Sequence, residues 1–305
     1  MALSAGDRKA LLSRWIKPSS DDEQDQQDRA QRMVREAIKA HSAFKGSNVL
    51  IYTKGSYPNN TNVRRDSDVD VAVELQDCIY YGYKSGVSAS SSVKTTPYSG
   101  SWTPATWRAE VKAALVNQFG SDGVDASGKI AINIRAVAGS RPSADVVPSF
   151  AYHRYDNSEK TDVKVGSCVF PADGGEKVVN WPQQQLDNGR AKNKATGGRY
   201  KDYVRALKNA ENTLAANGTI KDLPSYFMEC LGYNVPNGVL EEGDLDAGFR
   251  ATLANLWARL KDGSAAEDMV EPNYMKWLFK GRQKWSTDDA KSLVLKTWNY
   301  LAYGD

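Results

Sequence analysis

The stretch "KGSYPNNTNVRRDSDVDVAV", residues 54–73, decides the fold. It holds a Gly-Ser pair, Gly55-Ser56, and twelve residues after Ser56 it places Asp68 and Asp70 on either side of a valine. The alternation in "SDVDVAVEL" (67–75) predicts a half-buried β-strand, and residues two apart on a strand share a face. Asp68 and Asp70 therefore lie side by side, where their charges repel unless a cation lies between them.

The residue types near this pair favour a particular cation. Carboxylate oxygens without Cys or His are the ligands of Mg²⁺ or Mn²⁺ rather than of zinc. A second predicted strand, "ADVVPSF" (144–150), carries Asp145 and is expected to end at Pro148. If the two strands are neighbours, Asp145 completes a three-carboxylate site. Such a site can hold two metal ions that clamp the attacking and leaving oxygens of a phosphoryl transfer.

The Gly-Ser pair has a use beside such a site. A turn at Gly55-Ser56 lets backbone N–H groups and a hydroxyl approach a triphosphate closely. The opposing interpretation is that a lone Asp-x-Asp on a strand is a solvated surface face. The ordered set of strand, Gly-Ser turn, Asp-x-Asp strand and a further strand aspartate favours the metal site.

Composition limits the class of protein. The chain has 305 residues and a net charge of +3, which is too mild to imply a nucleic-acid partner. The three cysteines form no Cys-x-x-Cys pair, so a zinc site or a disulfide framework is not expected and a reducing compartment is. The N-terminus lacks the apolar core of a signal peptide, and no apolar run is long enough to span a membrane. We expect a cytoplasmic protein.

The periodicity of the chain changes along its length and predicts an α+β fold. The first part alternates helices and strands, whereas the rest is helical, and the boundary lies near residues 174–182. We expect a catalytic core over 1–176, with a mixed sheet, flanking helices and a long N-terminal spine helix, and a helical lobe over 177–305 that closes a nucleotide cleft. Helices are predicted at 21–44, 103–119, 197–218, 223–235, 245–263 and 286–304. A strand followed by the Gly-Ser turn is predicted at 48–56, and further strands at 67–75, 129–137, 144–150 and 163–171.

A basic helix lies after the boundary. Lys201, Arg205 and Lys208 recur at the spacing of one helix face. That face has three interpretations: a solvated basic surface, a triphosphate-binding surface opposite an acidic metal site, or a groove for nucleic acid. The basic stretch is short, so we place the nucleic-acid groove last.

Several of these stretches resemble a known family. "GSYPNNTNVRRDSDVDVAV" resembles the nucleotidyltransferase signature of the DNA polymerase β superfamily, and its "GS…T…R…SDVDV" form is similar to the bacterial cGAS/DncV-like nucleotidyltransferases. "WPQQQLDNGRAKNKATGGRYKDYVRALK" (181–208) and "LPSYFMECL" (223–231) resemble later parts of the same family. The resemblance covers roughly residues 20–300 and implies a polymerase β-like core with a helical C-terminal lobe.

The resemblance also assigns roles in the first motif. Asp68, Asp70 and Asp145 would be the catalytic metal ligands, holding two Mg²⁺ ions that Mn²⁺ could replace. Gly55 and Ser56 would hold the triphosphate. Asp145 is the residue expected to assist deprotonation of the attacking hydroxyl group.

Further roles fall in the helical half. The resemblance implies that Lys201 reaches a phosphate, with Arg205 and Lys208 as alternatives for that role. Ser225 and Tyr226 would sit on the donor nucleotide, with Tyr226 stacking on the base.

The activity that the resemblance implies is synthesis of a cyclic di- or trinucleotide from nucleoside triphosphates such as ATP, with release of pyrophosphate. Such products are second messengers in bacterial anti-phage (CBASS) signalling, so a CBASS regulatory protein is an expected partner. We expect a monomer that requires neither nucleic acid nor a membrane. Two rival functions are transfer to another acceptor (an RNA 3′ end, a small molecule or a protein) and a non-catalytic scaffold of the same fold.

Overall fold

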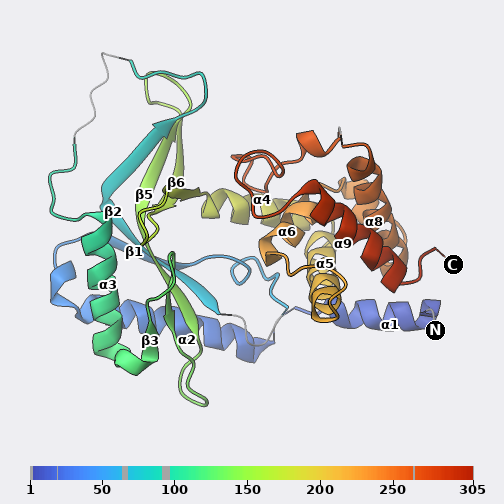
Figure 1. Cartoon of the computed structure of the whole chain (residues 1–305), viewed down its shortest axis with the longest axis horizontal. Coiled ribbons are helices and arrows are strands. Elements are labelled where there is room, and N and C mark those ends of the chain that lie inside the picture. The colour runs from blue at the N-terminus through green and yellow to red at the C-terminus, as the bar shows by residue number, and fades with distance from the viewer. Residues whose placement is uncertain (1–2, 19, 64–67, 91–96, 264, 305) are drawn as a thin grey trace. The chain divides into compact units, whose positions relative to one another are not determined.

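The computed structural model of the protein describes residues 3–18, 20–63, 68–90, 97–263 and 265–304 (Figure 1). The chain divides into two compact units. The sheet unit consists of Asp21–Tyr57 and Asp66–Pro182, and the helical unit of Met1–Ser20, Pro58–Arg65 and Gln183–Asp305. The helical unit thus takes in a short piece of the quoted motif, between the Gly-Ser turn and the Asp-x-Asp strand.

A seven-stranded mixed sheet forms the centre of the sheet unit. The order of strands is β1-β2-β5-β4-β3, and β5 also pairs with β6, which pairs with β7. The β2–β5 pair is parallel and the other pairs are antiparallel. The strands are β1 (Val49–Thr53), β2 (Val69–Tyr83), β3 (Val124–Asp125), β4 (Ile132–Ile134), β5 (Ala144–Tyr155), β6 (Val163–Val169) and β7 (Val178–Asn180).

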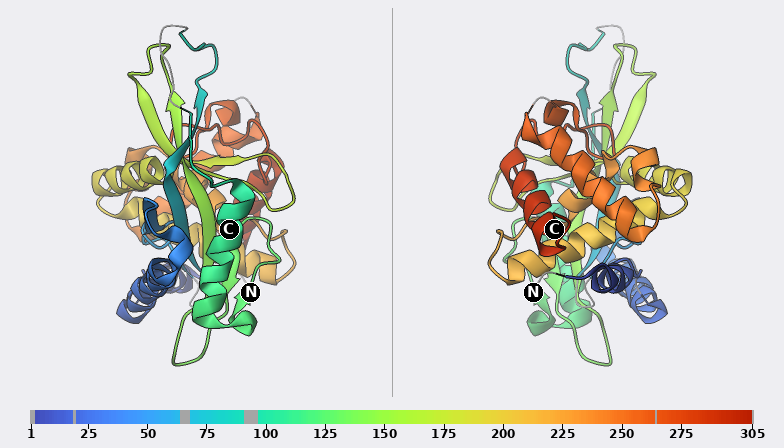
Figure 2. Two further views of the ribbon diagram at one scale, coloured as in Figure 1. Left: turned by 90° about the vertical axis from the view of Figure 1, so that its left-hand side faces the viewer. Right: turned by 90° about the vertical axis from the view of Figure 1, so that its right-hand side faces the viewer.

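Two helices cover the sheet. Helix α2 (Asp21–Ala40) packs over β1 and β2, and α3 (Pro104–Phe119) packs over β3, β4 and β5 (Figure 2). Helix α3 begins at a capping box in which Thr103 and Thr106 exchange hydrogen bonds. The buried Trp107 side chain of α3 donates a hydrogen bond from Nε1 to the Val73 carbonyl oxygen on β2 (3.3 Å). The sequence predicted both helices, although α2 ends at Ala40 and a 3₁₀ turn (Ser42–Phe44) follows it.

Several strand predictions need correction: β2 runs to Tyr83, beyond the predicted end at 75, β4 is shorter than the predicted 129–137, and β3 and β7 are additional. The strand predicted to end at Pro148 continues to Tyr155, because β5 changes its neighbour from β4 to β6 on one side at this point, so the missing N–H of Pro148 is tolerated. The predicted half-buried strand is buried on both faces from Val69 to Leu75 except at Asp70. Even Glu74 is covered, because its carboxylate accepts hydrogen bonds from Tyr52 (2.9 Å) and Gln76 (2.6 Å).

The helical unit has its own hydrophobic core, built from large side chains of several helices. Tyr200, Tyr203, Phe227 and Phe249 are fully buried in it. The four helices predicted for the second half are confirmed as α5, α6, α8 and α9, and α1, α4 and the short α7 are additional. The elements are α1 (Ala5–Trp15), α4 (Pro182–Ala195), α5 (Arg199–Ala216), α6 (Ser225–Tyr233), α7 (Asn237–Leu240), α8 (Leu245–Lys261), a 3₁₀ turn (Ala265–Asp268) and α9 (Thr287–Tyr300).

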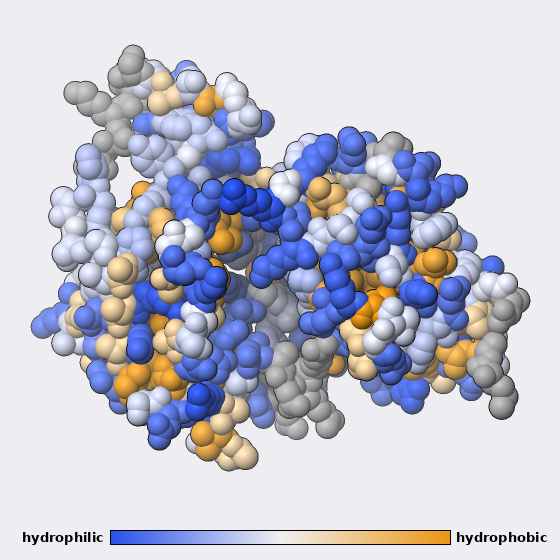
Figure 3. Space-filling model, in the orientation of Figure 1, coloured by the Kyte–Doolittle hydropathy of each residue, from blue (hydrophilic) through white to orange (hydrophobic). Residues whose placement is uncertain are grey.

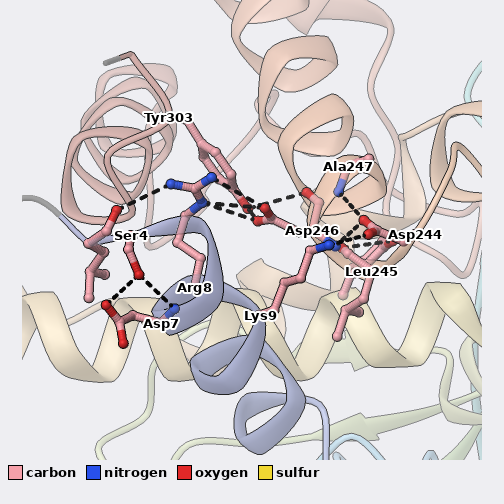
Figure 4. A network of polar contacts seen from close by, with 11 residues as sticks. Ser4, Asp7, Arg8, Lys9, Asp244, Leu245, Asp246, Ala247 and Tyr303 are labelled. Carbon is pink, nitrogen blue, oxygen red and sulfur yellow. Dashed lines mark hydrogen bonds and ion pairs between the residues drawn. The ribbon is translucent and has the colours of Figure 1, made fainter.

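A polar network joins α1 to α8 and to the end of the chain (Figure 4). The Asp246 carboxylate, at the start of α8, accepts hydrogen bonds from Arg8 (3.4 Å) and from the Tyr303 hydroxyl (2.8 Å). Arg8 also lies over the Tyr303 ring, 5.1 Å from its centroid. Asp246 is therefore a buried charge whose partners come from both ends of the chain.

The surface in Figure 3 is dominated by hydrophilic residues, and its hydrophobic residues form small separate patches. No helix in the described part of the chain combines the length and the hydrophobicity needed to cross a membrane. Cys78, Cys168 and Cys230 are buried, and none of the three is in a disulfide.

Candidate active site

Strand register brings two of the predicted carboxylates together. Asp70 on β2 is the direct partner of Asp145 on β5 in the parallel pair. Asp145 is in turn the partner of Asn133 on β4. Partners on adjacent strands point to the same face of a sheet. Asp70, Asp145 and Asn133 therefore form a polar row across three strands.

Asn133 holds the third carboxylate beside this row. Its amide Nδ2 donates hydrogen bonds to Asp68 Oδ2 (3.3 Å) and to Asp145 Oδ1 (3.0 Å). An amide donor between two carboxylates reduces their repulsion without adding a charge. We assigned no role to Asn133 from the sequence. The available signal was its place as the polar residue of the otherwise apolar "IAINI" (130–134).

The Gly-Ser turn lies against Asp70. Gly55 has φ = +79°, and a Cβ atom there would be 2.6 Å from Asp70 Oδ2. A side chain at position 55 would strain the backbone and crowd the Asp70 carboxylate, so glycine is favoured here. The Lys54 N–H donates to the Asp70 carbonyl oxygen (3.0 Å), so the turn is fastened to the start of β2. Ser56 follows, half-buried, as the next hydroxyl along the chain.

Lys54 supplies the positive charge at this site. Burial raises the pKa of the Asp70 carboxyl group, and the charge of Lys54 opposes that shift while Asp145 and Asp68 add to it. Burial likewise lowers the pKa of the Lys54 ammonium group, against the attraction of Asp70, Asp145 and Glu74. We assigned Lys54 no role from the sequence, although it stands directly before the Gly-Ser turn. Lys54 and Asn133 together explain how the protein tolerates three neighbouring carboxylates.

The donor set can be compared with the needs of a metal ion. Asp68, Asp70 and Asp145 offer only oxygen atoms, which suit Mg²⁺ or Mn²⁺. Two of those oxygens lie within 3.3 Å of the same nitrogen of Asn133. Across the described residues, no three His, Cys, Asp or Glu side chains converge closely enough to hold an ion as they stand. The chemistry of the donors fits a hard divalent cation.

Arg205 and Lys208, on the basic face of α5, make hydrogen bonds within the helical unit. Arg205 and Lys208 are only 5% and 2% exposed. Arg205 donates to the backbone oxygens of Ile16 (2.6 Å) and Asn60 (2.6 Å). The interpretation of a solvated basic surface is therefore wrong for these two residues. Lys201, in the first turn of α5, is half-buried, and burial together with the nearby charge of Arg190 lowers its pKa.

Ser225 and Tyr226 open helix α6 in the same unit. Ser225 is exposed and Tyr226 is half-buried. The Tyr226 hydroxyl donates to Glu271 Oε2 (3.1 Å), and its ring meets that of Trp285 edge-on, with centroids 6.3 Å apart. Burial raises the pKa of the Tyr226 hydroxyl. The ring is thus held by its polar end against the interior of the helical unit.

The chain is similar to proteins of known activity over nearly its whole length. It is 35% identical over 297 residues to the cyclic dipyrimidine nucleotide synthase CdnE of Legionella pneumophila, covering 97% of this chain and 98% of the relative. Its structure matches that of the Elizabethkingia meningoseptica CdnE cyclic dinucleotide synthase with GTP and Apcpp, with a TM-score of 0.79 and 29% identity over 96% and 98% of the two chains.

A second structural match agrees with the first. The Rhodothermus marinus CdnE c-UMP-AMP synthase with Apcpp and Upnpp has a TM-score of 0.79 and 27% identity, over 97% of both chains. The sequence profile of the cGAS/DncV-like nucleotidyltransferase C-terminal helical domain matches residues 187–302. These findings confirm the predicted α+β fold and the resemblance from which the site residues were assigned: the chain belongs to the cGAS/DncV-like nucleotidyltransferases.

Proposed function

We propose that this protein joins nucleoside triphosphates into a cyclic di- or trinucleotide and releases pyrophosphate. The observation that carries the proposal is the register of Asp70 with Asp145, beside Asp68, in a chain that aligns end to end with cyclic nucleotide synthases. The sequence-based expectation of a cyclic nucleotide synthase agrees with the names of those relatives.

The carboxylates have separate roles in the proposed reaction. Asp68, Asp70 and Asp145 would hold two Mg²⁺ ions, for which Mn²⁺ could substitute. When bound, the metal lowers the pKa of the attacking ribose hydroxyl group and neutralises phosphate charge. Asp145 accepts the proton of the ribose hydroxyl group. At the same time the ribose oxygen forms a bond to the α-phosphorus of the donor nucleotide. The bond from that phosphorus to the bridging oxygen breaks, and pyrophosphate leaves.

The Gly-Ser turn would bind the triphosphate. Gly55 has no side chain, so the backbone N–H groups of the turn can approach phosphate oxygens closely. The Ser56 hydroxyl is the next donor in the chain. The hydrogen bond from the Lys54 N–H to the Asp70 carbonyl oxygen attaches the turn to β2. It keeps the turn near Asp70, one of the residues that would hold the metal.

The helical unit would contribute contacts to the nucleotide. Lys201 is the best candidate for a phosphate contact, because Arg205 and Lys208 are buried and already bonded within the helical unit. Ser225 and Tyr226 would bind the donor nucleotide, with the Tyr226 ring against the base. The bond from the Tyr226 hydroxyl to Glu271 would fix the orientation of that ring.

The proposed biological setting is anti-phage CBASS signalling in the cytoplasm. The substrates are ATP and a second nucleoside triphosphate, which can be a purine or a pyrimidine nucleotide. We propose a monomer that needs no nucleic acid and that responds to a CBASS regulatory protein. The buried cysteines, none of them in a disulfide, agree with a reducing compartment.

A direct test uses the purified chain with the four nucleoside triphosphates and Mg²⁺. We expect a phosphatase-resistant product whose mass identifies a cyclic di- or trinucleotide, and no product from the double variant Asp68→Asn with Asp70→Asn. Label that instead appears on added RNA or on another acceptor would support the rival transferase. Absence of any turnover, with and without a CBASS regulatory protein, would support the scaffold and contradict the proposal.

A further inference from the structure

A buried connector joins the two halves of the motif. Residues 58–63, which we call the connector, follow the Gly-Ser turn and lead toward Asp68. They belong to the helical unit, whereas the turn and the carboxylates belong to the sheet unit. Asn59, Thr61 and Asn62 are only 2%, 1% and 5% exposed. Most buried polar side chains in proteins are held by hydrogen-bond partners. Here Asn59 Nδ2 and Thr61 Oγ1 have such partners, whereas Asn59 Oδ1 has none.

Glu229 on α6 is the main partner of the connector. It is 2% exposed, and its two carboxylate oxygens accept hydrogen bonds from Asn59 Nδ2 (3.0 Å) and Thr61 Oγ1 (3.3 Å). Gln185 on α4 donates a further bond to it (3.0 Å). A buried carboxylate is costly unless several donors surround it, and here two of those donors come from the connector. The position of the connector is therefore coupled to Glu229.

Two basic residues of α5 hold the connector from another side. Lys208 Nζ donates to Thr61 Oγ1 (3.2 Å), and its charge lies opposite that of the buried Glu229. Arg205 Nη1 donates to the carbonyl oxygen of Asn60 (2.6 Å). Asn60 has φ = +51°, a left-handed conformation that asparagine adopts more readily than most residues, and the bond from Arg205 fixes its carbonyl oxygen there. The connector is thus held in one defined conformation.

The helices that hold the connector are those that carry the candidate nucleotide contacts. On α5, Lys201 lies about two turns before Lys208, and on α6, Tyr226 lies one turn before Glu229. The connector also begins two residues after Ser56 in the same continuous described segment. The hydrogen bonds of Glu229, Lys208 and Arg205 therefore fix the position of the connector relative to helices α5 and α6.

We propose that Glu229, together with Lys208, is a positioning residue for the reaction. In this role it would act not by touching the substrate but through the connector, which begins two residues after Ser56, and would hold the Gly-Ser turn where the donor triphosphate needs it. This inference rests on the proposed function. Displacing phosphate-binding groups by about 1 Å can cost on the order of 10²-fold in rate. Loss of the Glu229 contacts is therefore expected to lower the rate even though the reacting groups are unchanged.

The test compares three variants in the full chain. Glu229→Gln keeps the size of the side chain but puts an NH₂ group where Asn59, Thr61 and Gln185 need an acceptor. Thr61→Val removes the bridging hydroxyl from the connector side and is the milder change. Asp246→Asn is the matched control, because Asp246 is also a buried carboxylate of the helical unit but bonds Arg8 and Tyr303.

Three readouts separate positioning from stability: kcat and KM, the affinity for a non-hydrolysable ATP analogue, and hydrogen exchange of residues 58–63. We expect Glu229→Gln to lower kcat/KM by on the order of 10²-fold, with a raised KM and weaker analogue binding, and to speed exchange in the connector. Thr61→Val should show the same pattern more weakly. Asp246→Asn should lower the melting temperature while KM, analogue affinity and connector exchange stay at wild-type values.

Each outcome decides the inference. Wild-type KM and analogue affinity in both Glu229→Gln and Thr61→Val, measured where the variants are folded, would overturn it. So would an equal rise of KM in Asp246→Asn, because the effect would then be one of general stability. A wild type that binds the analogue without forming product contradicts the proposed function alone, and analogue affinity and exchange then decide the inference. A wild type that binds no analogue contradicts both.

Discussion

Asp70 and Asp145, which are 75 positions apart in the sequence, are direct partners in the parallel β2–β5 pair. This pairing puts two carboxylates of the motif on one face of the sheet, and Asn133, the partner of Asp145 on β4, extends the row. The neighbouring Lys54 and the amide of Asn133 offset the repulsion. The resulting surface is acidic yet stable, as a site for divalent cations requires.

The first prediction concerns Asp145. Replacing it by asparagine keeps the size of the side chain and an oxygen for the Asn133 amide, but removes the charge and the proton acceptor. We expect Asp145→Asn to lower pyrophosphate release on the order of 10³-fold with little change in melting temperature. Asp156→Asn is the control, since Asp156 follows the far end of β5 and bonds Arg154 (2.7 Å). Comparable losses of turnover in both variants would argue against a special role for Asp145.

The second prediction concerns Asn133. The variant Asn133→Asp places a further carboxylate between Asp68 and Asp145, and like charges on facing strand positions destabilise by about 0.2–1 kcal/mol. We expect it to unfold at a lower temperature than Asn133→Ala in the absence of divalent ions. Added Mg²⁺ or Mn²⁺ should raise the melting temperature of Asn133→Asp more than that of the wild type. Equal responses of the three proteins to the ions would contradict a cation site here.

The third prediction concerns Gly55. Gly55→Ala adds a Cβ atom 2.6 Å from Asp70 Oδ2 to a residue at φ = +79°. Gly46 is a matched control, because its φ is +88° and nothing lies within 4 Å of an added Cβ. Both variants should lose about 1–2 kcal/mol of unfolding free energy from backbone strain. Only Gly55→Ala should also lose nucleotidyltransferase activity, and retention of that activity would show that the turn does not need close approach.

The fourth prediction concerns pH. Burial lowers the pKa of Lys208 to about 8, from 10.5. Between these values the unfolded chain keeps a proton that the folded protein has lost, so the contribution of Lys208 to stability rises with pH. Lys192 shifts in the same direction, to about 8, and therefore contributes the same trend.

The measurement must isolate Lys208 from Lys192. We expect the unfolding free energy of the wild type, relative to that of Lys208→Met, to increase between about pH 7.5 and pH 9.5 in denaturant titrations. The upper limit avoids the range above pH 10, where ionisation of tyrosines in the unfolded chain has the opposite effect. A difference that stays constant or falls over this interval would show that Lys208 is not a buried, depressed lysine.

Local patterns were sufficient for much of the fold. The alternation around Asp68 and Asp70 predicted a strand, Thr103-Pro104 predicted the start of α3, and helical spacing predicted α5 and α6. These features depend on neighbours a few residues apart, so one sequence contains the information. The same patterns also carried the resemblance that the comparisons confirmed.

Long-range contacts decided the rest. Whether Asp145 meets Asp70, and whether Asn133 lies between carboxylates, depends on which strands pair. Pro148 is tolerated within β5 because the strand next to β5 changes from β4 to β6 at this point. Arg205 and Lys208 have the spacing of an exposed basic face, but the carbonyl of Asn60 and the hydroxyl of Thr61 draw them inward. Helical periodicity records only that such residues share a face. The partner that covers the face comes from a distant part of the chain, so its burial is a property of the tertiary structure alone.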